Sequence, residues 1–381
     1  MLNAGGGLLA GLFLAVTQAA AADLPLKAPV KAADFNPFWV EADALAWSVK
    51  GDHLPALVTT SPAGTPLAQA GLLGLPTTTV LFGDSDVNDG WRAGGRITAG
   101  YWFDPSRSRE LEGSFFGLGD VSTGFAADSA ATPIIARPFL DATSNLQNAA
   151  LVAFPRLDAG SIAINEKSRL LGAGALYRQD IGMWGGQRIS ALVGYRYLRS
   201  SDDLAIASQS TFLGGGSVAV SDSFGAISQF HGLDLGLAGE WRDGPWSLEW
   251  RSKVALGGNI NSGNINGATT TTGFHGFAAV AAGGMLTQPG NIGNFSQTRF
   301  AAVPEVSLKA GYQIAPRWQL VAGYDALYWS GVQRAGGLID TTVNPNLLPG
   351  GAGGGPNRPM PTMNTTALVA QGFSFGVRYN Y

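Results

Sequence analysis

The sequence TALVAQGFSFGVRYNY, residues 366–381, ends the chain and alternates between two kinds of side chain. From Phe373 to Tyr381 every second residue is aromatic or branched, and the residues between them are small or polar. Successive side chains of a β-strand point to opposite faces, so this period of two predicts an amphipathic strand. An apolar edge strand would invite aggregation in water, whereas a closed barrel in lipid leaves no free edge. We therefore expect residues 366–381 to be the last strand of a membrane barrel.

The same alternation recurs in nine earlier stretches. In one of them, Ile189, Ala191 and Val193 alternate with Arg188 and Ser190. The fold class that this predicts is all-β, an antiparallel transmembrane β-barrel of about ten strands. Twelve strands are an alternative, because residues 119–167 could contain a further pair. The predicted strands are 38–49, 91–103, 109–118, 168–178, 188–198, 229–241, 246–257, 304–314, 318–329 and 366–381.

Short turns and long connections alternate between these strands. Residues 104–106, 180–186, 243–245 and 315–317 carry Asp, Gly or Pro at the positions that tight turns require. The other connections are long and rich in Gly, Ser, Thr and Asn. Short periplasmic turns and long extracellular loops are typical of outer-membrane barrels. The predicted long loops are 50–90, 119–167, 199–228, 258–303 and 330–365.

Two further features favour a membrane barrel over a soluble β-sandwich. Most predicted strands reach the length of about 9–11 residues that crosses a bilayer. Aromatic side chains also gather beside the short turns, as Tyr101, Trp241, Trp246 and Trp318 show. Aromatic rings prefer the headgroup level of a membrane, so this placement marks one interface.

The N-terminus predicts export. An apolar run over residues 8–16 and the small residues 19–22 are typical of a signal peptide, although no Lys or Arg precedes the run. We expect a signal peptide at 1–22, a Pro-containing periplasmic lead-in at 23–37, and the barrel at 38–381. The expected location is the outer membrane of a Gram-negative bacterium, with part of the chain at the cell surface.

Composition excludes several kinds of chemistry. The chain has 381 residues, a net charge of −3 and no cysteine, which removes disulfides and thiolate chemistry. No basic block is present, so we expect no nucleic-acid partner. We expect outer-membrane lipid as a partner, and also the barrel-insertion machinery, because the final strand looks like the assembly signal of bacterial barrels. The residues of that signal are Phe373, Phe375, Val377, Tyr379 and Tyr381.

Charged residues lie on the strand faces opposite the apolar ones, and we predict that they point into the lumen. A barrel of about ten strands is little wider inside than its side chains, so these charges form either a packed ion-pair network or a narrow polar channel. The predicted lumen charges are Glu41, Asp43, Arg92, Arg96, Glu110, Glu112, Arg196, Asp234, Glu240, Glu249, Arg251, Lys253, Glu305 and Lys309, with Asp325 as a further candidate.

Two kinds of surface site are weaker hypotheses. Asp84, Asp86, Asn88 and Asp89 alternate like the start of a calcium loop, but the glycine and the final glutamate of such a loop are misplaced. His53 is the one candidate for a hydrolytic histidine. We predict no enzymatic activity and no cofactor, since no nucleotide-binding loop and no cluster of histidines is present.

Many short motifs follow one another in an order that resembles a known bacterial family. The motifs are FWV at 38–40, VKGD at 49–52, LVTTSP at 57–62, VLFGDSDVNDG at 80–90, LEGSFFGL at 111–118, LVAFP at 151–155, VGYRYL at 193–198, NIG at 291–293, VPEV at 303–306 and NPNLLP at 344–349. On these motifs the chain resembles the beta-barrel porin-seven family of outer-membrane proteins from about residue 38 to its end. The resemblance implies an outer-membrane β-barrel, and the family name implies a pore.

These observations predict a narrow, porin-like pore for passive permeation of small solutes. The alternative is a non-conducting barrel with a structural or surface-interaction role carried by its long loops, whose ligand the sequence does not name. An outer-membrane hydrolase is the least favoured function.

Overall fold

Ten strands form one hydrogen-bonded ring in the computed structural model, which describes residues 35–274 and 277–381. Every neighbouring pair in the ring is antiparallel, and the first strand pairs with the last, with Trp39 opposite Asn380. The expected antiparallel ten-strand barrel is confirmed. The ring strands are β1 (Phe38–Val49), β6 (Gly90–Trp102), β7 (Arg109–Asp128), β10 (Asp158–Trp184), β11 (Gln187–Phe212), β12 (Ser217–Asp243), β13 (Trp246–Phe274), β15 (Gly293–Ala315), β16 (Trp318–Gln333) and β18 (Thr365–Asn380).

Burial along the strands is inverted relative to a soluble protein. On β12, Leu233 and Leu237 are 52% and 45% exposed, while Asp234 between them is 1% exposed. The same arrangement holds around the ring, with apolar side chains outside and charged ones inside. A continuous apolar outer band is stable against lipid and would be a liability in water.

Four short connections join the ring strands at one end, as predicted. Three of them consist of two residues each, at 185–186, 244–245 and 316–317. Gly185 and Gly186 both have positive φ, of 57° and 77°, which is the backbone of the two-residue hairpin turn that glycine favours. The expectation that residues 180–186 form the turn is too wide, because β10 continues to Trp184.

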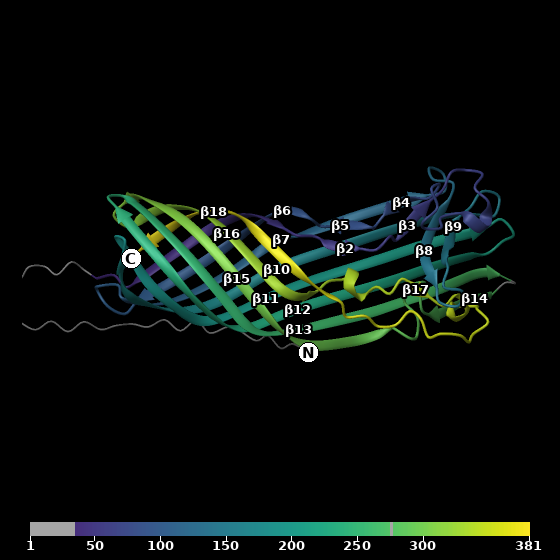
Figure 1. Cartoon of the computed structure of the whole chain (residues 1–381). Coiled ribbons are helices and arrows are strands. Elements are labelled where there is room, and N and C mark those ends of the chain that lie inside the picture. The colour runs from purple at the N-terminus through teal and green to yellow at the C-terminus, as the bar shows by residue number, and fades with distance from the viewer. Residues whose placement is uncertain (1–34, 275–276) are drawn as a thin grey trace, which may run out of the picture. The chain divides into compact units, whose positions relative to one another are not determined.

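The strands extend far beyond the apolar band at the opposite end. The expectation of a long loop over 199–228 is wrong, because β11 and β12 run through it with a turn of only residues 213–216. Most of 258–303 is likewise strand, including β14 (Phe277–Ala282), which pairs with the outer end of β13. Figure 1 shows β10 to β13 running together to this end of the barrel.

The outward-facing side chains change from apolar to polar where the strands extend beyond the membrane. On β11 the outward residues change from Tyr195 and Tyr197 to Arg199, Ser201 and Asp203. Water replaces lipid outside at this point, so polar side chains now face outward. The strand therefore continues although its apolar outer face has ended.

A smaller sheet lies at the end of the ring opposite the short turns (Figure 1). The alternative of twelve ring strands is not borne out in the described chain, because the extra strands of 119–167 belong to this smaller sheet. Arg137 on β8 ties it to the wall through an ion pair of 2.7 Å with Asp222 on β12. The sheet consists of β3 (Val58–Thr60), β4 (Thr79–Phe82), β8 (Ile135–Asp141), β9 (Gln147–Ala153) and β17 (Thr342–Val343).

Short elements complete the inner segments. β2 (Asp52–Leu54) pairs with β5 (Ser85–Val87) as a separate ribbon. The three 3-10 turns are η1 (Leu67–Gln69), η2 (Gly336–Leu338) and η3 (Pro345–Leu347). None of the helices within the described residues is long and apolar enough to cross a membrane.

Residues 37–381 form one compact unit. The predicted signal peptide at 1–22 and most of the predicted lead-in at 23–37 lie outside the described residues.

Candidate functional site in the barrel interior

The interior is built in layers, which can be followed along the inward face of β11. Arg196 lies at the level of the lipid-facing band, and Leu198 follows it. Asp202 comes next, and then Leu204 and Ile206. The lumen therefore contains a charged layer, an apolar layer, an acidic cluster and an upper apolar core, in that order from the short turns.

The charged layer is a network of ion pairs. Arg96 contacts Asp43 at 2.8 Å and Asp325 at 3.2 Å, and Lys253 contacts Glu305 at 3.1 Å. Arg251 bridges Glu112 at 2.7 Å and Glu249 at 2.8 Å. The further pairs are Lys309 with Glu41 and Asp43, Arg196 with Asp234 and Glu305, and Lys253 with Asp234.

All the predicted lumen charges lie on the inward face, but two lie apart from the main network. Arg92 is above it and donates to Ser168 Oγ and to the Asn88 carbonyl. Glu240 is near the short turns and pairs with the exposed Arg242.

Two cations of the network were absent from the predicted set. Arg178 contacts Glu249 at 3.2 Å and Glu110 at 3.9 Å, while Arg378 contacts Glu41 at 2.7 Å. Both have the inward parity of their strands, so the period of two, carried to the strand ends, would have found them.

Little space remains between these charges. One cavity within the network has a volume of about 50 Å³ and a second, nearer to the short turns, about 20 Å³. A water molecule needs about 10–15 Å³ on this measure, so the two cavities hold a few waters.

An apolar layer crosses the barrel above the network. Trp47 and Phe116 have ring centroids 5.2 Å apart, and Phe230 and Trp329 are 6.4 Å apart. The layer forms one buried cluster with members from every ring strand except β6. Its members are Leu45, Trp47, Val49, Phe116, Leu118, Leu170, Leu198, Phe230, Ala255, Ala301, Val303, Leu327, Trp329, Val332, Leu368 and Ala370.

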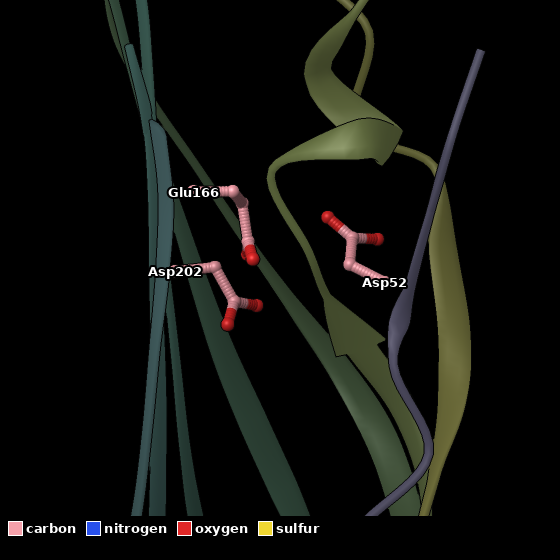
Figure 2. Close-up of side chains that lie close together, drawn as sticks. All are labelled: Asp52, Glu166 and Asp202. Carbon is pink, nitrogen blue, oxygen red and sulfur yellow. The ribbon is translucent and has the colours of Figure 1, made fainter. Parts of the chain in front are cut away.

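An acidic cluster lies between this layer and the upper core. Oxygen atoms of Asp52, Glu166 and Asp202 lie within 4.8 Å of one another, and the three residues are 2%, 0% and 0% exposed. Glu166 and Asp202 point from the wall strands toward Asp52, which approaches from the opposite side (Figure 2). Sequence reasoning did not bring these residues together, because Asp52 lies outside the ring strands.

Burial raises the pKa values of Glu166 and Asp52. Both lie beyond the outward-facing Lys167 and Arg169 and so outside the membrane. The pKa of Glu166 rises to about 8, chiefly through burial and then through the charges of Asp202 and Asp52. Burial also raises the pKa of Asp52 to about 6, against the attraction of Arg334.

A segment after β16 holds the cluster from above, and we call residues 334–340 the strap. Arg334 donates through Nε to Asp202 and through Nη1 to the Lys50 carbonyl at 3.3 Å. The Gly336 amide donates to Asp52 Oδ2 at 2.7 Å. The strap thus connects the inner ribbon to the barrel wall.

The calcium candidates do not converge on one point. Asp86 pairs with His53 at 2.9 Å, Asp89 accepts from the Gly51 amide at 3.0 Å, and the Asn88 side chain donates to Glu166. Asp84 is exposed in the preceding bend. The carboxylates of this segment therefore form no group within reach of one metal ion among the described residues.

The hydrolytic candidate also lacks a nucleophile within the described part of the chain. The described hydrogen bonds give His53 the carboxylate of Asp86 and no serine hydroxyl.

One known protein family matches the part of the chain that forms the ring of strands. The family described as "Putative beta barrel porin-7" matches residues 39–381, which is nearly the whole chain. The chain belongs to this family. It is an outer-membrane β-barrel protein, and the resemblance and the outer-membrane location expected from the sequence are confirmed.

No curated protein matches this porin-7 family member in sequence. Solved barrels resemble it weakly. The outer membrane protease OmpT from Escherichia coli has a TM-score of 0.42 and 10% identity, covering 91% of this chain and 98% of its own. A FadL homologue of Pseudomonas aeruginosa has a TM-score of 0.23 and 8% identity, with coverage of 91% and 90%. TM-scores and sequence identities this low do not indicate a function for this chain.

Proposed function

We propose that this protein is a sealed outer-membrane barrel whose role is carried by its cell-surface half. The observation that carries the proposal is the apolar layer through Trp47, Phe116, Phe230 and Trp329, which are all less than 9% exposed. Apolar constrictions stop ions because water withdraws from them. This supports the non-conducting alternative from the sequence over the narrow pore.

The charged layer supports the same function. Each cation of the network contacts at least one carboxylate, as Arg251 does with Glu112 and Glu249. Ions moving through a pore need polar groups that they can bind and leave. Paired charges around a few waters provide no such path.

The surface half is folded rather than a set of loose loops. Leu54, Ile135, Leu204 and Leu338 belong to one buried core that joins the smaller sheet, the strap and the tall wall strands. A rigid, water-facing structure of this kind suits contact with a partner outside the cell. We propose a structural or surface-interaction role without catalysis.

The experiment is single-channel recording of the refolded protein in planar bilayers, after a heat-modifiability gel has verified the folded barrel. We expect no steady conductance over a wide range of voltage. Steady, reproducible channel openings from the wild-type barrel would overturn the proposal and restore the pore.

A matched pair of double variants tests whether the apolar layer seals the barrel. Trp47→Ala with Phe116→Ala removes two inward rings, and Trp91→Ala with Phe115→Ala removes two rings from the outer face, where they are 63% and 51% exposed. We expect transient leak currents only from the inward pair. Equal leakage from both pairs would show damage to the wall rather than an opened seal.

A further inference from the structure

Three carboxylates meet in the interior although they come from separate parts of the chain. Asp52 belongs to β2, Glu166 to β10 and Asp202 to β11, and their side chains are turned toward one another (Figure 2). Three negative charges within 4.8 Å repel strongly when they are shielded from water. Such an arrangement needs a compensating positive charge or a proton.

The protein's own cations supply only part of this compensation. Arg334 is paired with Asp202 through a single carboxylate oxygen, Oδ2. Arg92 forms no ion pair within the described chain, and donates instead to a hydroxyl and a carbonyl. Glu166 accepts from Asn88, which is neutral. Two guanidiniums therefore act on three carboxylates, and only that of Arg334 contacts one of them directly.

Buried acceptor atoms at the cluster are also left without hydrogen bonds. Glu166 Oε1 and Asp202 Oδ1 have no donor among the described residues. The same holds for the hydroxyl of Ser200, the preceding inward residue on β11, which is 1% exposed. Unpaired buried acceptors destabilise a fold, the more so when they are charged, so nearly all such groups in native proteins have a partner.

We propose that Asp52, Glu166 and Asp202 bind a divalent cation, and that Ca²⁺ fits best. Calcium takes oxygen ligands at about 2.3–2.6 Å, so oxygens on opposite sides of one ion stand about 4.6–5.2 Å apart. Magnesium demands a near-ideal octahedron and usually keeps several waters, whereas calcium accepts irregular sets of carboxylate and carbonyl oxygens. A buried site whose ligands come from three separate segments suits the less demanding ion.

The bound ion would connect the inner segments to the barrel wall. Asp52 is hydrogen-bonded to Gly336 of the strap, and Glu166 and Asp202 belong to the tall strands β10 and β11. A cation shared by these residues makes the packing of the cell-surface half dependent on calcium. This effect is separate from the seal, which the apolar layer forms by itself.

The test is isothermal titration of the refolded, full-length protein with CaCl₂ after treatment with a chelator, at pH 8. We expect one ion per chain and a higher midpoint of heat modifiability with calcium. Glu166→Gln should weaken binding by about tenfold or more, since loss of even a supporting group at a metal site costs about 10–100-fold in affinity. Asp52→Asn provides the same test if the first variant does not fold.

Two control variants define the site. Asp203→Asn removes the neighbouring charge on the exposed, outward face of β11, and Asp86→Asn removes one from the calcium-like segment. Neither should change the affinity. Loss of binding in Asp86→Asn but not in Glu166→Gln would overturn the proposal, because calcium would then bind the surface segment.

No binding to the wild-type protein at millimolar calcium would also overturn it. The cluster would then be held by a shared proton or a buried water, and Glu166→Gln should raise the heat-modifiability midpoint without calcium. The same titration with MgCl₂ tests the choice of ion, and tighter binding of magnesium would contradict the preference for Ca²⁺.

Discussion

At the scale of single residues, Glu166 makes stability depend on pH, together with Asp52, whose pKa burial also raises. Its pKa is about 8 in the folded barrel and 4.5 as an ordinary side chain. A carboxyl whose pKa is raised by folding stabilises the folded state at low pH, and that contribution is lost as pH rises through the folded pKa. With a chelator present, we expect the heat-modifiability midpoint to fall between pH 4.5 and about pH 8.

Glu166→Gln should reduce the slope of this pH profile, since an amide has no proton to lose. The part of the slope below about pH 6, to which Asp52 contributes, should remain. Asp203→Asn, on the exposed face of the same barrel wall, should leave the slope unchanged. A profile of unchanged slope in Glu166→Gln would assign the pH dependence to another group.

Arg251 tests the ion-pair network at the same scale. Arg251→Ala would leave Glu112 without its cation and Glu249 with one fewer. We expect a loss of about 3–5 kcal/mol in the free energy of unfolding, because breaking a buried pair leaves an uncompensated charge. Urea unfolding in lipid vesicles measures it. Arg242→Ala, which breaks a pair with a 55% exposed arginine, should cost less than about 1 kcal/mol.

The lumen charges could be predicted from the sequence because their position depends only on local alternation. Arg96 and Asp234 point inward for the same reason that Ile97 and Leu233 point outward. The acidic cluster could not be predicted in this way. Asp52 meets Glu166 across 114 positions of sequence only because the segment after β1 folds back into the barrel.

At the scale of elements, the ten strands were predictable and their lengths were not. Apolar outer faces marked each strand only where it crosses lipid. Beyond that level Ser221, Ser223 and Gly225 face water while Phe224 and Ala226 face the core, so β12 has the pattern of a soluble strand. A search for that second, inverted alternation would have extended the strands into the predicted loops.

The final strand β18 permits a test of assembly. It pairs with both β1 and β16, and the Tyr381 amide donates to the Phe38 carbonyl, so the ring closes through its end. We predict that Tyr379→Ser with Tyr381→Ser lowers the amount of heat-modifiable barrel in cells several-fold while refolding in detergent persists. Tyr324→Ser with Tyr328→Ser, on the lipid face of β16, is the matched control. Equal losses in both double variants would contradict the prediction that Tyr379 and Tyr381 act in assembly.

At the scale of the whole molecule, orientation in the membrane is the first property to verify. Short turns are periplasmic in such barrels, and extended strands lie outside the cell. The chain lacks cysteine, so a single introduced thiol reports its own position. In intact cells, a maleimide polymer too large to cross the outer membrane should label Ala130→Cys and should miss Ser106→Cys. Labelling of Ser106→Cys alone would show that the short turns lie outside the cell and would contradict the expected orientation.

The tall hairpin of β11 and β12 has a practical consequence. Residues 213–215 at its tip are exposed, and side chains added at Gly214 and Gly215 would meet nothing within 4 Å. Exposed hairpin tips with small residues tolerate insertions well. A foreign peptide placed there would be carried away from the membrane on two paired strands and away from the ion-pair network. The barrel therefore offers a rigid carrier for displaying peptides on living bacteria.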